Sequence, residues 1–265
     1  MFSIDLNCDM GESFGAWRMG TDVELMNYVS SVNVACGFHA GDASVIRKTV
    51  EAAIEKSIAV GAHPSFPDLQ GFGRREMKMT AQEIFDVVLY QVSAVKGICE
   101  ALGSRLHHVK PHGALYNQAA KDAPVARAVA EAVRAIDENL IFYGLAGSFL
   151  ISEAEKIGLK TASEVFADRT YQTDGSLTPR RQPDALIPDA EKAAAQVLQM
   201  IRAQSVTATS GEIVAVRAET VCIHGDGANA LEFAETINAK LSENGISIKP
   251  VNKIADKRGL FIGIE

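Results

Sequence analysis

Short apolar runs alternate along the chain with longer segments whose apolar residues recur at helical spacing. The runs SVNVACGF, IAVGAH and TVCIHGD are rich in Val, Ile and Ala, which is typical of parallel strands buried on both faces. After SVNVACGF, residues Ile46, Val50, Ala53 and Ile54 fall on one face of a helix. The pattern therefore predicts repeated units of one strand and one helix.

About seven such strands are each followed by a helical crossover, which predicts a parallel sheet. An open doubly wound sheet gathers its polar residues at one switch point, whereas a barrel gathers them at the carboxyl ends of all its strands. Here polar residues cluster after nearly every strand. We therefore predict an α/β fold, a β/α barrel in one domain over residues 1–265, with a capping box at Thr80–Glu83 and an added hairpin in VTATSGEIVAV.

Titratable residues stand at the ends of these predicted strands. VNVACGFHAGD, IAVGAHPSF and TVCIHGDG each contain a histidine before turn residues, LHHVKPHGALYN ends in lysine, proline and histidine, and DLNCDMGES follows the first strand. Polar groups placed there cost free energy and add nothing to a core. Their recurrence predicts that the strand ends converge on one polar site, and that the protein is an enzyme.

The first strand places Asp5, Asn7 and Asp9 on one face. If this face lines the barrel, Asp9 lies nearest the mouth and is available for a metal ion or a proton, while Asp5 is an internal hydrogen-bonding group. Glu12 follows shortly after. Capping of the turn at Gly11 is the structural alternative for Asp9 and Glu12.

His39 and His63 end the second and third strands, which are expected to be neighbours. Two histidines and Asp9 on adjacent strand ends predict a divalent-metal triad with an open position for water. A proton-transfer cluster without metal is the alternative. Lys110 and His112 flank a proline at the next strand end, where a lysine can stabilise an anion or a developing oxyanion.

The last strand ends in His224 and Asp226 and is expected to close the barrel beside the first. This places Asp226 within reach of Asp9, and paired carboxylates can divide a general acid and base role. Two loops, 64–79 and 167–188, are too long for plain turns, and such loops are usually functional. Both loops carry a pair of arginines, Arg74 with Arg75 and Arg180 with Arg181, whose guanidinium groups suit a carboxylate or phosphate substrate. Exposed loops whose arginines pair with neighbouring acids are the structural alternative. Asp168 and Arg169 follow the sixth strand in the same way as His224 and Asp226 follow the last.

Composition narrows the class of partner. The 26 basic and 33 acidic residues give a net charge of −7, which argues against nucleic acid or an anionic membrane as partner. No apolar run approaches the ~18–20 residues that span a bilayer, and the first residues do not resemble a signal peptide. Four cysteines without C-x-x-C spacing predict buried thiols in a reducing cytoplasm. The sequence contains no P-loop, no dinucleotide fingerprint and no nucleophile elbow.

Six motifs together resemble one known family. DLNCDMGESFG, NVACGFHAGD, GAHPSFPDLQGFGRR, HVKPHGALYN, EVFADRTY and CIHGDG are similar, in order, to the LamB/YcsF family, the family of the A-type 5-oxoprolinase subunits. The resemblance runs from residue 3 to about residue 226. One departure is Thr170, where the family pattern leads us to expect a second arginine.

The resemblance implies a seven-stranded β/α barrel similar to the glycoside hydrolase/deacetylase fold. It also implies opening of 5-oxo-L-proline (pyroglutamate) to L-glutamate, coupled to ATP hydrolysis and carried out with two partner subunits of the B and C type. The chain itself does not show where ATP binds, and a homo-oligomer is left open. By analogy with deacetylases of similar fold, Asp9, His39 and His63 are candidate metal ligands.

These residues suit the implied chemistry. Asp9 or Asp226 and His63 are expected to activate water, while Lys110 and His112 stabilise the departing oxygen or phosphate. One of the arginines is expected to hold the substrate carboxylate. All the residues expected to bind the substrate are Glu12, Arg74, Arg75, Asp168, Arg169, Arg181 and His224. Two alternatives stay open, a metal-dependent deacetylase or amidohydrolase acting without ATP and a non-catalytic scaffold subunit.

Overall fold

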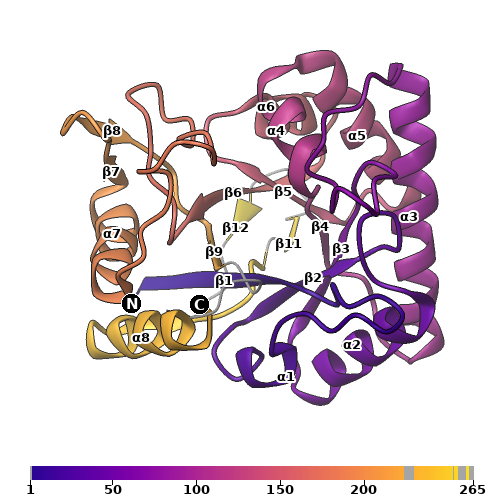
Figure 1. The fold of residues 1–265 in the computed structure, drawn as a ribbon, viewed down its shortest axis with the longest axis horizontal. Coiled ribbons are helices and arrows are strands. Elements are labelled where there is room, and N and C mark those ends of the chain that lie inside the picture. Colours follow the sequence, from indigo (N-terminus) through magenta and orange to yellow (C-terminus); the bar gives the residue numbers. More distant parts are fainter. Residues whose placement is uncertain (1, 224–229, 253, 256–260, 263–265) are drawn as a thin grey trace.

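The computed structural model describes residues 2–223, 230–252, 254–255 and 261–262, and these form a closed parallel barrel ringed by helices (Figure 1). Its strands pair in the order β1-β2-β3-β4-β5-β6-β9, and β9 pairs with β1 to close the barrel. The predicted seven-stranded β/α barrel is confirmed. The strands are β1 (Phe2–Met10), β2 (Ser31–Ala35), β3 (Ala59–His63), β4 (His108–Val109), β5 (Ile141–Leu145), β6 (Lys160–Phe166) and β9 (Thr220–Ile223).

Helices cover the outside of the barrel. They are α1 (Asp22–Leu25), α2 (Ala43–Glu55), α3 (Ala81–Ala101), α4 (Gly113–Lys121), α5 (Ala123–Ile136), α6 (Phe149–Lys156), α7 (Ala190–Ala203) and α8 (Ala230–Glu243). Asp42 caps α2 by accepting from the backbone N–H groups of Ser44 and Val45. The capping box predicted at Thr80 and Glu83 begins α3. No helix in the described ranges is long and apolar enough to cross a lipid bilayer.

The sequence pattern missed several short elements, among them α1, α4 and β10. α4 precedes the helix expected over about residues 122–137, which is α5, and Asp122 separates the two by capping α5. β10 (Ile246–Ile248) pairs in parallel with the amino end of β1. The hairpin predicted around Ser210 is present as β7 (Ser205–Thr207) and β8 (Ile213–Ala215), and β11 (Ile254–Ala255) pairs with β12 (Phe261–Ile262).

The two faces of β1 have different surroundings, as the alternation predicted. Ile4, Leu6, Cys8 and Met10 belong to the hydrophobic core. The other face, which carries Asp5, Asn7 and Asp9, points into the barrel. All four cysteines of the chain are buried and free, as expected from their spacing. The interior of this barrel is therefore polar, and that interior positions the site.

Candidate active site at the mouth of the barrel

The bottom of the barrel is closed by hydrogen bonds to the carboxylate of Asp5. The hydroxyls of Ser30, Ser31 and Thr220 donate to it over 2.7, 2.6 and 2.6 Å. Burial raises the pKa of Asp5, and the three hydroxyls partly offset this. Because Asp5 is 1% exposed and fully engaged, it anchors strands rather than meeting a substrate.

One level higher, two amides and a histidine are linked across the barrel. Asn7 Nδ2 donates to Thr220 Oγ1 at 2.7 Å, and Asn33 Nδ2 donates to Asn7 Oδ1 at 2.7 Å. His108 Nε2 lies 2.8 Å from Asn33 Oδ1. Gly61 leaves the room for this ring, because a Cβ there would lie 2.2 Å from His108 Nε2. We call Asp5, Asn7, Asn33 and His108 the deep layer.

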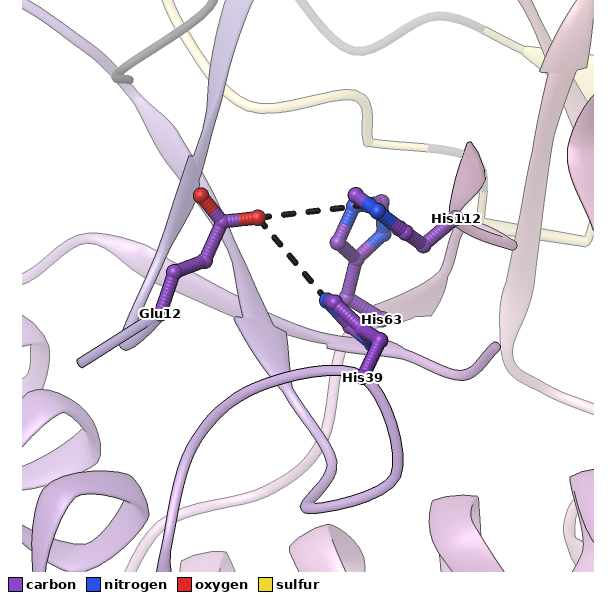
Figure 2. A group of neighbouring side chains, drawn as sticks. All are labelled: Glu12, His39, His63 and His112. Atoms are coloured by element: carbon purple, nitrogen blue, oxygen red, sulfur yellow. Dashed lines mark hydrogen bonds and ion pairs between the residues drawn. The ribbon is translucent and has the colours of Figure 1, made fainter. Parts of the chain in front are cut away.

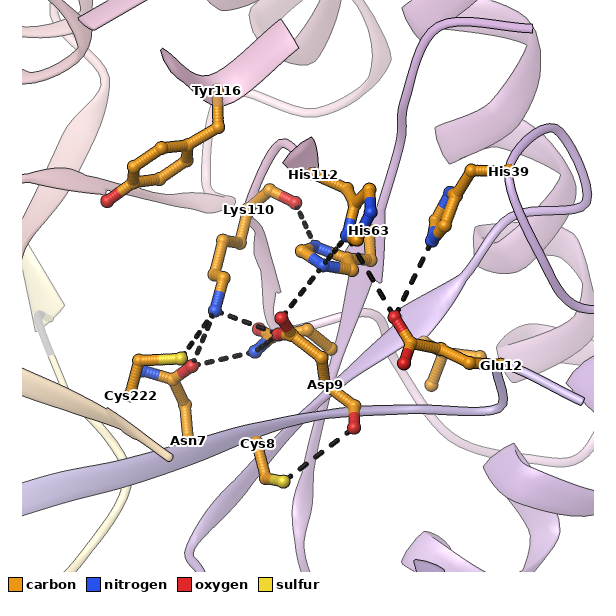
Figure 3. Close-up of polar contacts among 12 residues, drawn as sticks. Asn7, Cys8, Asp9, Glu12, His39, His63, Lys110, His112, Tyr116 and Cys222 are labelled. Atoms are coloured by element: carbon orange, nitrogen blue, oxygen red, sulfur yellow. Dashed lines mark hydrogen bonds and ion pairs between the residues drawn. The ribbon is translucent and has the colours of Figure 1, made fainter. Parts of the chain in front are cut away.

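Lys110 lies above the deep layer at the centre of the barrel (Figure 3). It is 2% exposed. Burial alone lowers its pKa, but the carboxylates of Asp9 and Glu164 outweigh burial and raise that pKa well above its usual range. The ammonium is therefore charged and fixed. Its Nζ contacts Asp9 Oδ1 at 2.8 Å, Glu164 Oε1 at 3.0 Å, Cys222 Sγ at 3.0 Å and Asn7 Oδ1 at 3.1 Å.

Glu164 is a site residue that the sequence reasoning did not single out. It lies on β6, is fully buried, and accepts hydrogen bonds from Asn7 Nδ2 at 3.1 Å and from the Tyr116 hydroxyl at 2.7 Å. Tyr116 comes from α4, the helix that the pattern also missed. The available signal was a carboxylate in the buried carboxyl-terminal half of a strand, which needs a buried partner.

Asp9 is the carboxylate that faces the open side of this network. Its Oδ1 contacts Lys110 and accepts from Asn33 Nδ2 at 2.9 Å. Its Oδ2 lies 3.2 Å from His63 Nε2. Asp9 thus has a fixed position between a charged lysine and an imidazole, which suits a general base.

Three histidines and Glu12 gather into a cluster (Figure 2), and Asp9 lies beside them (Figure 3). Their ligand atoms all lie within 4.8 Å of one another. His39 stacks on His112 with ring centroids 3.9 Å apart. Burial, and then the neighbouring imidazoles, hold the pKa values of His39 and His112 well below their usual range, so both rings are neutral. We call these four residues, together with Asp9 and Lys110, the mouth layer.

Turns place these side chains. Gly11 ends β1 with a φ of +71°, which brings Glu12 round toward the histidines. Gly73 has a φ of +64° and packs against the histidines, because a Cβ there would lie 2.9 Å from both His39 Cβ and His112 Cδ2. Loop 64–79 therefore covers the cluster directly.

The mouth layer opens into a pocket of about 810 Å³. Asp9, Glu12, His63, Lys110 and His112 line it, so the structure brings these predicted residues together. The arginines predicted to bind substrate line it as well: Arg74, Arg75, Arg169 and Arg181, with Arg180 beside them.

The pocket arginines are held differently. Arg75 forms an ion pair with Asp68 and is largely exposed. Arg169 is buried and donates to the backbone carbonyls of Ala185 and Thr178, so it also holds loop 167–188 in place. Burial, and then the neighbouring Arg180, lower the pKa of Arg169 to about 10.

Of the three remaining candidates, only Asp168 is among the residues that the structure describes. Asp168 is not among the described residues that line the pocket, and its backbone carbonyl accepts from the N–H of Ile187. Thr170, where an arginine was expected, bonds to Thr178 and to the carbonyl of Asp184. His224 and Asp226 fall outside the described residues, so their predicted roles stay predictions.

The fold and site together define a class: a parallel β/α-barrel protein with carboxylates, a buried lysine and histidines at the floor of an arginine-lined pocket. Residues 4–256 match the sequence model of the LamB/YcsF family, and the chain belongs to that family.

Similar proteins extend over nearly the whole chain. A Bordetella parapertussis protein, named as the A-type subunit of 5-oxoprolinase, is 60% identical over 247 residues, covering 93% of this chain and 98% of that protein. A Bacillus subtilis protein of the same name is 53% identical over 253 residues, covering 96% of this chain and 98% of that protein. The crystal structure of a lactam utilization protein from Thermus thermophilus has a TM-score of 0.90 and 45% identity, covering 94% of this chain and all of that one.

Proposed function

We propose that this chain is a subunit of an ATP-dependent 5-oxoprolinase that opens 5-oxo-L-proline to L-glutamate. The observation that carries the proposal is the contact of Asp9 with both Lys110 and His63 at the floor of an arginine-lined pocket. The names of the Bordetella, Bacillus and Thermus relatives support the choice of a lactam as substrate.

The substrate carries one carboxylate and one five-membered lactam. The arginines of the pocket, foremost Arg181 and Arg74, suit the carboxylate, because a guanidinium binds it through paired hydrogen bonds. This orientation directs the lactam toward the floor of the pocket. There the charged Lys110 stabilises negative charge that develops on the lactam oxygen or on a phosphate attached to it.

Ring opening needs water and a base. In our proposal ATP phosphorylates the lactam oxygen, and Asp9, which lies beside His63, takes a proton from a water that adds to the activated carbon. The ring C–N bond then breaks and the nitrogen gains a proton. A second water releases phosphate from the resulting acyl phosphate, so ATP, 5-oxoproline and two waters give ADP, phosphate and glutamate.

The proposed enzyme is an assembly. We assign ATP to it as co-substrate and propose two further subunits, of the B and C type, as partners of this chain. The naming of its relatives as A-type subunits supports such an assembly. A reaction that consumes ATP also agrees with the cytoplasmic location predicted from the buried free thiols.

Glutamate release from 5-oxoproline tests the proposal. The purified chain is assayed alone and with both partner subunits, each with and without ATP. Release in the full mixture with ATP, and not by the chain alone, is the expected result. Release by the chain alone without ATP would overturn ATP coupling and favour the second candidate, a stand-alone amidohydrolase. The observation that favours this second candidate is the cluster of three histidines and Glu12.

A further inference from the structure

His39 is a buried side chain that the proposed reaction does not use. It is 1% exposed, and neither ring nitrogen has a hydrogen-bond partner among the described residues. A neutral imidazole carries one N–H donor and one lone pair. Leaving such a buried group without a hydrogen-bond partner is unfavourable. An ion or water that the ring is placed to hold is the usual explanation for a group of this kind.

The other two rings are oriented from outside the cluster. His63 Nδ1 lies 2.6 Å from the carbonyl oxygen of Lys110, and His112 Nε2 lies 3.0 Å from the carbonyl oxygen of Phe72. A carbonyl only accepts, so both of these nitrogens carry the proton. Orientation of a ring by such a backbone bond is characteristic of metal-binding histidines.

The consequence lies between the rings. In the tautomers whose outer nitrogens carry the proton, His63 and His112 direct the lone pairs of Nε2 and Nδ1 toward each other across 2.9 Å. Lone pairs so close repel unless a cation binds them. Two nitrogens at ~2.0–2.1 Å from one zinc ion are separated by roughly 2.9–3.4 Å at octahedral to tetrahedral angles. The observed separation lies at the lower end of that range.

A shared proton is the alternative occupant, and Asp9 Oδ2, 3.2 Å from His63 Nε2, would stabilise it. A proton shared by His63 and His112 leaves the position of His39 unexplained. His39 Nε2 lies 3.8 Å from Glu12 Oε1. Glu12 Oε1 is also 3.9 Å from His112 Nδ1. Both distances are too long for hydrogen bonds. The ligand atoms of the four residues lie within 4.8 Å of one another, and a proton shared by His63 and His112 reaches neither His39 nor Glu12.

We propose that Glu12, His39, His63 and His112 bind one divalent transition-metal ion of the zinc class. Three imidazoles and a carboxylate suit zinc and its neighbours, whereas Mg²⁺ and Ca²⁺ prefer oxygen ligands alone. This set differs from the triad of Asp9, His39 and His63 expected from the sequence, because Lys110 and Asn33 engage Asp9. The inference rests on the proposed function and adds a metal ion to the pocket in which the lactam would be opened. Its test measures metal binding rather than glutamate formation.

Metal binding is measured on the full chain without an affinity tag, after treatment with a chelator. Calorimetric titration with Zn²⁺ is expected to give one ion per chain. Co²⁺ is expected to give the visible absorption of a site of low coordination number with nitrogen ligands. Failure of the wild-type chain to bind either ion stoichiometrically would overturn the proposal and leave the shared proton as the occupant.

Matched variants locate the ion. Glu12→Gln and His39→Gln are each expected to weaken Zn²⁺ binding at least about 100-fold. Glu76→Gln, in the same pocket, and His107→Gln, outside the cluster, are expected to bind like wild type. Circular dichroism checks that each variant folds, and the nearly isosteric Glu12→Gln decides the question if His39→Gln does not fold. Unchanged binding in Glu12→Gln would place the ion elsewhere and contradict the proposal.

Discussion

Asp5 and Asp9 lie on the same face of β1, yet they belong to layers of opposite character. In the deep layer, Asp5 accepts three hydroxyl hydrogen bonds and meets no pocket. In the mouth layer, Asp9 contacts Lys110 and His63 and lines the pocket. The polar groups of the deep layer bond to one another and so fix the strands, whereas the mouth layer keeps groups directed toward a ligand.

The difference shows how one barrel interior serves two purposes. Buried polar groups are tolerated when each has a partner, and a satisfied network specifies one arrangement of the strands. That rigid base positions the charged groups above it to within the tolerance that catalysis requires. Substitutions in the two layers should therefore separate stability from activity.

The largest effect is expected for Asp9→Asn, with Asp5→Asn as its matched control. Loss of the base should lower glutamate formation by the full mixture by about 10²–10⁴-fold with little change in stability. Asp5→Asn should instead cost about 1–3 kcal/mol of unfolding free energy and keep most of the activity. Steady-state rates and urea unfolding of both variants check this, and equal losses of activity in the two would erase the distinction between the layers.

The next effect concerns the lysine that joins the layers. Lys110→Met removes the positive charge between Asp9 and Glu164, so two neighbouring carboxylates lose the ammonium group that they share. We expect a loss of about 3–5 kcal/mol in unfolding free energy, measured by urea denaturation. Adding Glu164→Gln to this variant should restore part of it. A single variant as stable as wild type would mean that Lys110 does not hold the network together.

A smaller effect is expected for the loop above the histidines. In Gly73→Ala the new Cβ would lie 2.2 Å from Ser65 Oγ and 2.9 Å from His39 Cβ and His112 Cδ2, at a φ of +64°. Gly15→Ala is the control, because its φ is +56° but nothing lies within 4 Å of the added Cβ. We expect Gly73→Ala to cost about 1–3 kcal/mol more than Gly15→Ala in thermal or urea unfolding. An equal cost would show that the loop does not pack tightly on the cluster.

The smallest effect is the pH dependence that Asp5 contributes. Burial raises the pKa of Asp5 in the folded state. The unfolded chain, with a pKa near 3.9, therefore ionises first as pH rises, and stability falls until the folded pKa is passed. The stability of Asp5→Asn does not fall in this way, because asparagine does not ionise. The difference in unfolding free energy between wild type and Asp5→Asn, measured by urea unfolding from about pH 4 upward, should shrink as pH rises. A difference that widens would contradict a raised pKa of Asp5 in the folded state.

Most of the fold could be predicted because its signals are local. Apolar runs, helical periodicity and the capping box at Thr80 each fall within one element. α4 was missed because it begins at Gly113, directly after Pro111 and His112, where the pattern indicates a turn. β10 was missed because its three residues carry no period of their own.

The site residues also divide into those that a local sequence pattern reveals and those that depend on the closed barrel. Strand-end positions identified Asp9, His39, His63 and Lys110 without knowledge of the strand order. Their partners depend on stagger and closure of the barrel, so Asn7 meets Glu164 across 157 positions of sequence. No local pattern contains that pairing. The position of Glu12 beside the histidines likewise depends on the turn at Gly11.

The most direct test of the account is glutamate formed together with ATP consumed in the mixture of all subunits. Three mixtures are compared, one with the wild-type chain, one with Asp9→Asn, and one without this chain. The account predicts that glutamate appears in step with ATP consumption only with the wild-type chain. Equal glutamate formation in the mixture that lacks this chain would contradict the claim that its mouth layer opens the lactam.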